Sequence, residues 1–143
     1  KSHCKIDKSC CQTSSKAHQY CYRHQCYETT RQVAEYLELK EGTFSTSFQS
    51  RLGLDPWLRP YTDKTVAKFA KKGVKKMAIA TPAFVSDCLE TLEEIGMEAA
   101  EDFEEKGGEK LYVIPCINDR PDWVNVMSRW IEEWALAETA KTL

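Results

Sequence analysis

Residues 81–98 read TPAFVSDCLETLEEIGME and lead from a short apolar strand pattern at residues 77–80 into a helix rich in carboxylates. The acids spaced by three or four residues are Asp87, Glu90, Glu94 and Glu98. Side chains at these spacings share one helical face, where like charges repel one another. Such a face is most often plain solvated surface. The alternative is a site, because ligands of open α/β sheets bind beyond the carboxyl ends of the strands.

Strand and helix patterns alternate along the chain after its cysteine-rich opening. We expect strands at residues 44–49, 77–80 and 111–114, and helices at residues 17–37, 63–72 and 87–98 and beyond residues 118–122, with Asp122 as the last cap. This alternation predicts an α/β fold, a parallel sheet flanked by helices. Gly73 is expected at the C-terminal cap of the second helix, whereas Gly96 can interrupt the acidic one. An apolar stripe in the last helix is expected to pack in the core, and it consists of Trp123, Met127, Trp130, Ile131 and Trp134.

Length and charge limit the classes of protein to which the chain can belong. Its 143 residues suit one domain. A net charge of −2 and a pI near 6.0 give no electrostatic footprint for nucleic acid, and no apolar run reaches the ~18 residues of a spanning helix. No phosphate-binding glycine loop or G-x-S-x-G turn is present. Because the chain starts at Lys1, we expect it to be cut from a longer cytoplasmic protein.

Five of the seven cysteines lie in the first 26 residues, as Cys4, Cys10, Cys11, Cys21 and Cys26. Disulfides are not expected, because the count is odd and the chain otherwise has cytosolic features. The spacing lacks paired C-x-x-C knuckles, so an iron–sulfur cluster is favoured over structural zinc, and a metal-free segment is the third alternative. His3, His18 and His24 are alternative ligands. We interpret Cys88 and Cys116 as small buried side chains.

Four motifs together cover most of residues 43–125. They are SFQSRLG at residues 47–53, PWLRPYTD at residues 56–63, FVSDCLETLEEI at residues 84–95 and IND at residues 117–119. In order and spacing, these motifs resemble the carboxyl-terminal half of ferrochelatases. The opening, with CC at residues 10–11 and CYRHQC at residues 21–26, resembles the internal cysteine segment of bacterial ferrochelatases that hold a 2Fe-2S cluster. The resemblance implies a Rossmann-like chelatase half-domain.

The resemblance implies a lyase that inserts ferrous iron into protoporphyrin IX, the last step of haem synthesis, in a cleft between two similar α/β halves. Two pyrrole protons must leave the macrocycle as the metal enters, so bases are needed near its centre. Iron must also be held weakly enough to be released, which oxygen ligands permit better than thiolates. The implied partners are protoporphyrin IX, ferrous iron and the amino-terminal half of the same enzyme, without nucleic acid.

By motif position, Glu90 matches the family's active-site glutamate and is expected to remove protons or deliver metal. Asp87 and Glu94 complete the expected catalytic group, with Asp87 orienting its surroundings. Glu94 and Glu98 would continue a path for iron from Glu90, and a π-type irregularity would help to align these acids. Beside the porphyrin the resemblance places Gln49, Ser50, Arg51 and Trp57, although Trp57 packed on its own domain is an alternative. The implied cluster ligands are Cys4, Cys11, Cys21 and Cys26, with Cys10 as the alternative.

Two departures from the family pattern affect the expected activity. Cys88 stands where the family often has histidine, so a base is missing or is replaced by a thiol. The family's catalytic histidine lies in a strand-end motif resembling SFHGLP, and no segment of the chain matches it, since His3 lies beside Cys4. We therefore expect half an active site, and no chelatase activity from the 143 residues alone.

The expected organisation is a cysteine-rich cluster segment at residues 1–30, followed by a ferrochelatase-like α/β domain at residues 31–143. Two alternative functions stay open. One is an iron–sulfur or zinc-binding module without catalysis, in which the acidic face is plain surface. The other is a chelatase for coproporphyrin or another tetrapyrrole. We expect a cytoplasmic location, with peripheral contact to the inner membrane as an alternative.

Overall fold

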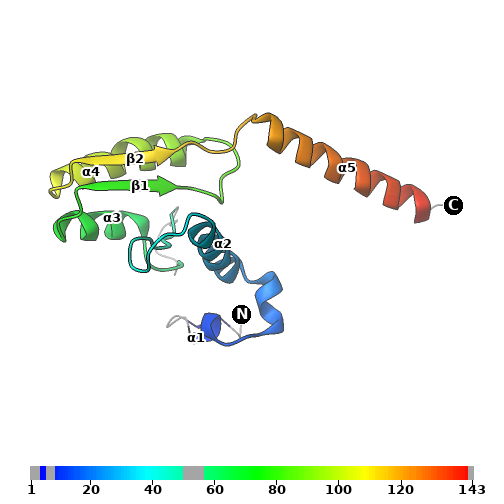
Figure 1. Ribbon diagram of the computed structural model, residues 1–143, viewed down its shortest axis with the longest axis horizontal. Helices are drawn as coiled ribbons and strands as arrows, with labels where there is room; N and C mark the ends of the chain where they lie inside the picture. Colours follow the sequence, from blue (N-terminus) through cyan, green and yellow to red (C-terminus); the bar gives the residue numbers. More distant parts are fainter. Residues whose placement is uncertain (1–3, 6–8, 50–56, 142–143) are drawn as a thin grey trace.

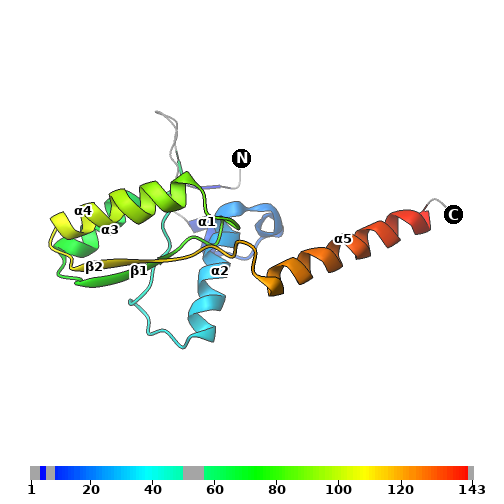
Figure 2. The same cartoon turned by 90° about the horizontal axis from the view of Figure 1, so that it is seen from above.

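The computed structural model describes residues 4–5, 9–49 and 57–141 (Figure 1). Its elements in chain order are α1 (Ser9–Gln12), the 3₁₀ helix η1 (Lys16–Tyr20), α2 (Tyr22–Tyr36), α3 (Thr62–Lys71), β1 (Lys76–Ala80), the π-helix η2 (Glu90–Glu98), α4 (Ala99–Glu105), β2 (Lys110–Ile114) and α5 (Pro121–Lys141). The η2–α4 segment connects the two strands, and α5 extends away from them (Figures 1 and 2).

Strands β1 and β2 pair in parallel, in a register that joins Met77 to Leu111 and Ile79 to Val113. These four side chains lie on one face of the sheet, because strand residues two apart point the same way. Helices α3 and α4 cover that face (Figures 1 and 2), and Phe103 of α4 lies at the centre of the core with no exposed surface. The predicted α/β fold with a parallel sheet is therefore confirmed.

The strand expected at residues 44–49 does not form. Phe48 makes one isolated parallel bridge, to Tyr61, through hydrogen bonds from its N–H to Pro60 O (2.9 Å) and from Thr62 N–H to its own carbonyl (3.1 Å). The alternating Phe and Thr pattern was read as a strand, but a strand also needs a neighbour along its whole length, and the described residues offer one at this point alone. The described sheet has two strands rather than the three expected.

The single helix expected at residues 17–37 is interrupted at Cys21, whose extended backbone (φ −92°, ψ 102°) separates η1 from α2. Ser15 caps η1 by accepting the Ala17 N–H at 3.2 Å. Helix α2 ends at a left-handed residue, Glu38 (φ 52°), with hydrogen bonds from Glu38 N–H to Glu35 O and from Leu39 N–H to Ala34 O. The continuous apolar pattern therefore did not show the extended residue at Cys21, which divides the segment into two helices.

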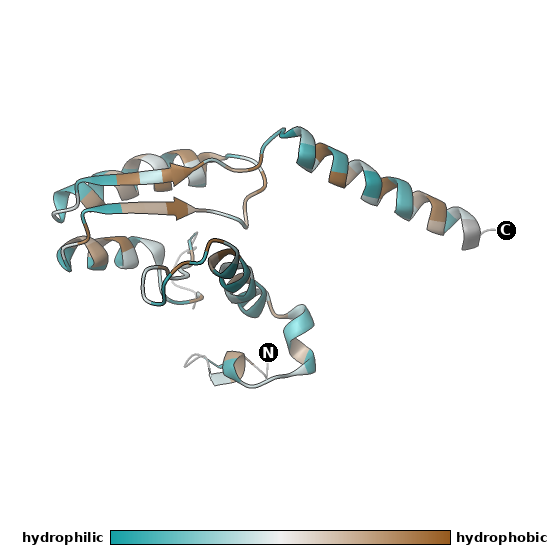
Figure 3. Ribbon diagram, viewed as in Figure 1, coloured by the Kyte–Doolittle hydropathy of each residue, from teal (hydrophilic) through white to brown (hydrophobic). Residues whose placement is uncertain are grey.

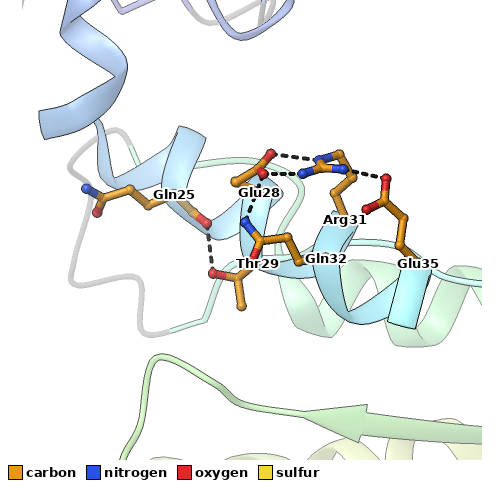
Figure 4. Close-up of polar contacts among 6 residues, drawn as sticks. All are labelled: Gln25, Glu28, Thr29, Arg31, Gln32 and Glu35. Carbon is orange, nitrogen blue, oxygen red and sulfur yellow. Dashed lines mark hydrogen bonds and ion pairs between the residues drawn. The ribbon is translucent and has the colours of Figure 1, made fainter. Parts of the chain in front are cut away.

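The solvent face of α2 carries a chain of charged and amide side chains (Figure 4). The Arg31 guanidinium binds the carboxylates of Glu28 and Glu35, and Gln32 donates to Glu28 at 2.9 Å. Hydrogen bonds from Arg31 and then from Gln32 lower the pKa of Glu28 to about 2. Solvent-exposed pairs at these spacings contribute little to the stability of a helix. This face of α2 is therefore a solvent-exposed surface whose charged groups pair with one another.

Helices α3 and α4 both end in Schellman caps. The predicted cap residue Gly73 has φ +89°, and Val74 N–H bonds Phe69 O at 3.1 Å. After α4, Gly108 N–H bonds Phe103 O at 2.9 Å, and a Cβ at position 108 would lie 2.3 Å from the Phe103 ring. The turn before β2 therefore needs glycine because the buried ring fills the space that a side chain would occupy.

The prediction that the apolar stripe of the last helix packs in the core is wrong for most of the stripe. Helix α5 begins at Pro121, a favoured first helical residue, so Asp122 lies in its first turn rather than at its cap. Figures 1 to 3 show α5 pointing away from the sheet, with apolar and polar residues alternating around it. Trp130, Ile131 and Trp134 are 59%, 62% and 66% exposed. Helical spacing predicted the stripe correctly, but the described residues supply no surface to cover it.

Truncating the central ring tests the described core. We expect Phe103→Ala to lower the free energy of unfolding by about 3–5 kcal/mol, because it opens a cavity between α3, α4 and the sheet. Met97→Ala, at a residue of η2 that is 59% exposed, is the matched control and should change stability by less than about 0.5 kcal/mol. Urea unfolding followed by circular dichroism measures both. Equal effects of the two substitutions would contradict this core.

Candidate functional site

The candidate site lies at the carboxyl ends of β1 and β2, where the loops at residues 81–89 and 115–120 meet. Asp87 in the first loop and Asn118 in the second are joined by two hydrogen bonds, and each residue donates one of them. Asp87 N–H donates to Asn118 Oδ1 at 2.8 Å, and Asn118 Nδ2 donates to Asp87 Oδ2 at 2.7 Å. Asn118 N–H also donates to Val85 O at 2.9 Å. These bonds join two loops that are 31 residues apart in the chain.

The second oxygen of Asp87 is also engaged. Its Oδ1 accepts from Thr91 Oγ1 at 2.9 Å and from Cys116 N–H at 3.5 Å. Hydrogen bonds from Asn118, and then from Cys116 and Thr91, hold the pKa of Asp87 below its ordinary value of 3.8. Thr91 is 1% exposed and accepts Cys88 N–H at 3.0 Å. The motif-based analysis missed Thr91 and Asn118 as site residues, although the D-x-x-E spacing from Asp87 to Glu90 is a helix-start signal that draws attention to this turn.

The acidic segment forms a π-helix, η2 (Glu90–Glu98), so the expected π-type irregularity is confirmed. Ala99 N–H bonds Glu94 O, five residues back, which is the π-helical pattern. The helix continues through Gly96 and is not interrupted there. A Cβ at Gly96 would lie 3.3 Å from Thr91 O, which is a tight contact, so glycine at this position leaves room for the Thr91 carbonyl in the π-helix.

The π-helix lines a pocket of about 220 Å³ with residues from other segments. Its walls are Gln49, Asp63, Val66, Glu94, Glu98, Ala99 and Asp102. The Gln49 side-chain amide donates to the Glu94 carboxylate, and Trp57 Nε1 donates to Gln49 O at 2.9 Å. The structure thus brings Gln49, Trp57 and Glu94 together. Four carboxylates, two of them predicted, make this pocket acidic, but among the described residues no three of them lie close enough together to ligate one metal ion.

Other predicted residues lie outside this pocket. Glu90 and Asp87 do not line it, and Ser50 and Arg51 lie outside the described residues. The structure adds two acids that the sequence reasoning missed, Asp63 and Asp102. Asp102 continues the four-residue spacing of the acidic face, which is the signal that could have found it.

Glu90 is partly exposed at the start of η2, near the sheet end. A hydrogen bond from the Cys88 side chain, and then one from its own backbone N–H, lower the pKa of Glu90 below its ordinary value of 4.5. The Cys88 thiol thus contacts the acid that is expected in the active site. Cys116 is buried, as expected, and burial raises the pKa of its thiol.

The five cysteines of the opening segment are free thiols, and among the described residues no three His, Cys, Asp or Glu side chains lie together as metal ligands. Cys10 is buried and accepts from the buried Arg23 Nη2 at 2.9 Å, while Cys4 is exposed. The pKa of Cys10 is lowered, first by a backbone hydrogen bond from Lys5 and then by Arg23. His18 and His24 stack on each other at 3.8 Å. The donor chemistry fits a thiolate-held cluster, although the described sulfurs are not gathered at one point.

Comparisons with known proteins bear on this site. The family model Ferrochelatase matches residues 8–135. Ferrochelatase from Pseudomonas putida strain KT2440 is 46% identical over 125 residues, which is 87% of this chain and 37% of the relative. The ferrochelatase of Opitutus terrae is 45% identical over 135 residues, which is 94% of this chain and 39% of the relative. The ferrochelatase of Legionella pneumophila strain Lens is 45% identical over 130 residues, which is 89% of this chain and 39% of the relative. The chain spans less than two-fifths of the length of these relatives.

The engaged carboxylate of Asp87 predicts an acid-dependent loss of stability. Because its folded-state pKa lies below 3.8, its stabilising contribution is fully present above the ordinary carboxyl pKa and is lost as pH falls through the lower folded value. Asp87→Asn should therefore flatten the dependence of unfolding free energy on pH below about 4. Urea titrations at several acidic pH values measure this slope. Asp119→Asn, at an exposed acid of the opposite loop, is the control; equal slopes in both variants would contradict the assignment.

Proposed function

Because the chain belongs to the ferrochelatase family, we propose that it forms part of an enzyme that inserts ferrous iron into protoporphyrin IX and releases haem. The single observation that carries this proposal is the acidic pocket, in which Glu94 and Glu98 of a π-helix meet Gln49 beside Trp57. The chain spans less than two-fifths of its relatives. The complete reaction is therefore proposed for a longer protein, with an amino-terminal half as the partner of this chain.

The flat macrocycle would lie against Trp57, whose indole is 43% exposed and is held by its N–H bond to Gln49 O. A rigid aromatic surface of this kind binds a planar apolar ligand at a low cost in conformational entropy. Ser50 and Arg51 are proposed to border the same ligand from the position next to Gln49. Orientation of the porphyrin is thus the proposed role of this loop.

Glu90 is the proposed base at the sheet end. The Cys88 hydrogen bond holds the pKa of Glu90 below its ordinary value of 4.5, so the side chain is a carboxylate at neutral pH. This charge attracts the incoming cation, although the lowered pKa makes the carboxylate a weaker acceptor of a pyrrole proton. Glu94 and Glu98, with Asp63 and Asp102 around the same pocket, would guide ferrous iron toward it. Carboxylate oxygens hold this ion less tightly than thiolates would, which allows its transfer to the porphyrin nitrogens.

Replacing the proposed base tests the function. In the full-length protein that carries this chain, Glu90→Gln should lower the kcat for iron insertion by about 10²–10⁴-fold, because it removes the proton acceptor. Glu93→Gln is the matched control, since Glu93 is an exposed acid of the same π-helix, and it should leave kcat within about twofold. Haem formation is followed by absorbance with iron and protoporphyrin IX. An unchanged rate in Glu90→Gln would favour the binding module without catalysis, and a preference for coproporphyrin would favour the related chelatase.

We propose that the opening segment holds a 2Fe-2S cluster through Cys4, Cys11, Cys21 and Cys26, with Cys10 as the alternative ligand. The support is chemical, since the five cysteines within the first 26 residues are free thiols, and the buried cation of Arg23 beside Cys10 favours thiolate there. When bound, such a cluster supplies a one-electron redox centre and a cross-link between these segments. Zinc bound by the same thiolates is the competing proposal.

The metal content of the purified protein separates these proposals. After anaerobic purification we expect visible absorbance and about two iron and two sulfide per chain, both of which Cys21→Ser should abolish. Cys88→Ser, outside the opening segment, is the control and should keep both. Zinc without sulfide, or the same iron content in Cys21→Ser, would contradict the cluster.

A cytoplasmic location with peripheral membrane contact stays a proposal. The exposed stripe of Trp130, Ile131 and Trp134 on α5 is the described feature that could supply such contact. In the described part of the chain, no helix has both the length and the apolar character that crossing a bilayer requires. The boundary at residue 30 between a cluster segment and an α/β domain also stays a prediction, and α2 runs across it.

A further inference from the structure

The Asp87–Asn118 pair is joined by two hydrogen bonds and is bonded to two further groups. Asn118 offers its Oδ1 to Asp87 N–H at 2.8 Å and its Nδ2 to Asp87 Oδ2 at 2.7 Å. The remaining oxygen, Asp87 Oδ1, already accepts from Thr91 Oγ1 at 2.9 Å and from Cys116 N–H at 3.5 Å. Both oxygens of Asp87 are thus held by groups of the protein itself, which fixes the orientation of this carboxylate between the two loops. The geometry therefore separates the role of Asp87 from that of Glu90.

The pair is also bonded to the first turn of the π-helix. Thr91 stands in the first turn of η2 and is 1% exposed, so its bond to Asp87 fixes that turn against the end of β2. Asn118 has a left-handed backbone (φ 53°), which turns its N–H toward Val85 O while its side chain faces Asp87. Asparagine is among the few residues that adopt this conformation readily. Both its backbone and its side chain thus contribute to the link between the two loops.

We infer that Asn118 is a positioning residue for metal insertion, which holds Glu90 at the sheet end by clasping Asp87 and, through it, Thr91. This inference rests on the proposed ferrochelatase function. It gives Asn118 a task that does not require contact with porphyrin or iron. It also makes Asp87 a part of the clasp, so that what matters at position 87 is the hydrogen-bond pattern and not the negative charge as such.

An exchange of the two side chains separates a clasp from a catalytic carboxylate. In the full-length protein, Asn118→Asp places two carboxylates face to face and should lower kcat for iron insertion by on the order of tenfold to a hundredfold, with a smaller change in KM. The double variant Asp87→Asn with Asn118→Asp restores one carboxylate and one amide in reversed positions. Its acidic partner can still accept from the backbone N–H of residue 87, so most of the lost kcat should return.

Two further variants keep the test decisive. Asn118→Gly keeps the left-handed backbone accessible but removes both side-chain bonds, so it should also lose kcat even if Asn118→Asp folds poorly. Asn125→Asp adds the same charge at an exposed residue of α5 and should leave kcat unchanged. Unfolding by urea, measured for each variant, shows which of them are folded at the assay temperature.

The outcomes distinguish this inference from the proposed function. If the unaltered protein inserts no metal into protoporphyrin IX, the proposed function fails, and the inference fails with it. If the unaltered protein is active and Asn118→Gly matches its kcat, only the inference is overturned. If the double variant is no better than Asp87→Asn alone, the charge at position 87 is itself required and the clasp is again overturned. Recovery in the double variant supports the clasp.

Discussion

The parallel pairing of β1 with β2 forces the chain to return across the full length of the sheet before the second strand can begin. A tight turn cannot make this connection, and a crossover of about a dozen residues or more is required. Here the crossover runs from the end of β1 through η2 and α4 to the start of β2. Its two ends are held differently: Phe103 anchors α4 in the core, and Asp87 binds Asn118 beyond the strand ends. The acidic helix η2 lies between these two fixed points in the chain.

This arrangement explains why an energetically unfavourable row of acids is tolerated. The inner side of the crossover is buried through Thr91, Ile95 and Phe103, which are 1%, 1% and 0% exposed. With that side fixed, Glu94 and Glu98 face the pocket opposite Gln49, whose amide binds Glu94. Repulsion among the acids costs only a few tenths of a kcal/mol per pair, far less than the burial of a large apolar side chain provides. A cation would relieve that repulsion, which agrees with the proposed path for iron.

Much of the candidate site could be predicted from local patterns. The four-residue spacing pointed to Glu94 and Glu98, which line the pocket, and the motif around Gln49 and Trp57 pointed to the loop that meets them. Asp63 and Asp102 were missed because their place in the pocket depends on how α3 packs against α4. Errors about α5 and residues 44–49 share a cause: periodicity shows that a segment has an apolar face, but not whether a partner lies next to it.

The sequence by itself determined the α/β alternation, the glycine cap at Gly73, the cysteine-rich opening and the family, because each of these depends on residue identity and short-range spacing. Only the tertiary structure decided which distant residues meet. Gln49 and Glu94 are 45 residues apart in the chain, and Asp87 and Asn118 are 31 apart. Such contacts follow from how strands and helices pack, since their hydrogen bonds form only after burial of the core has brought the two segments together.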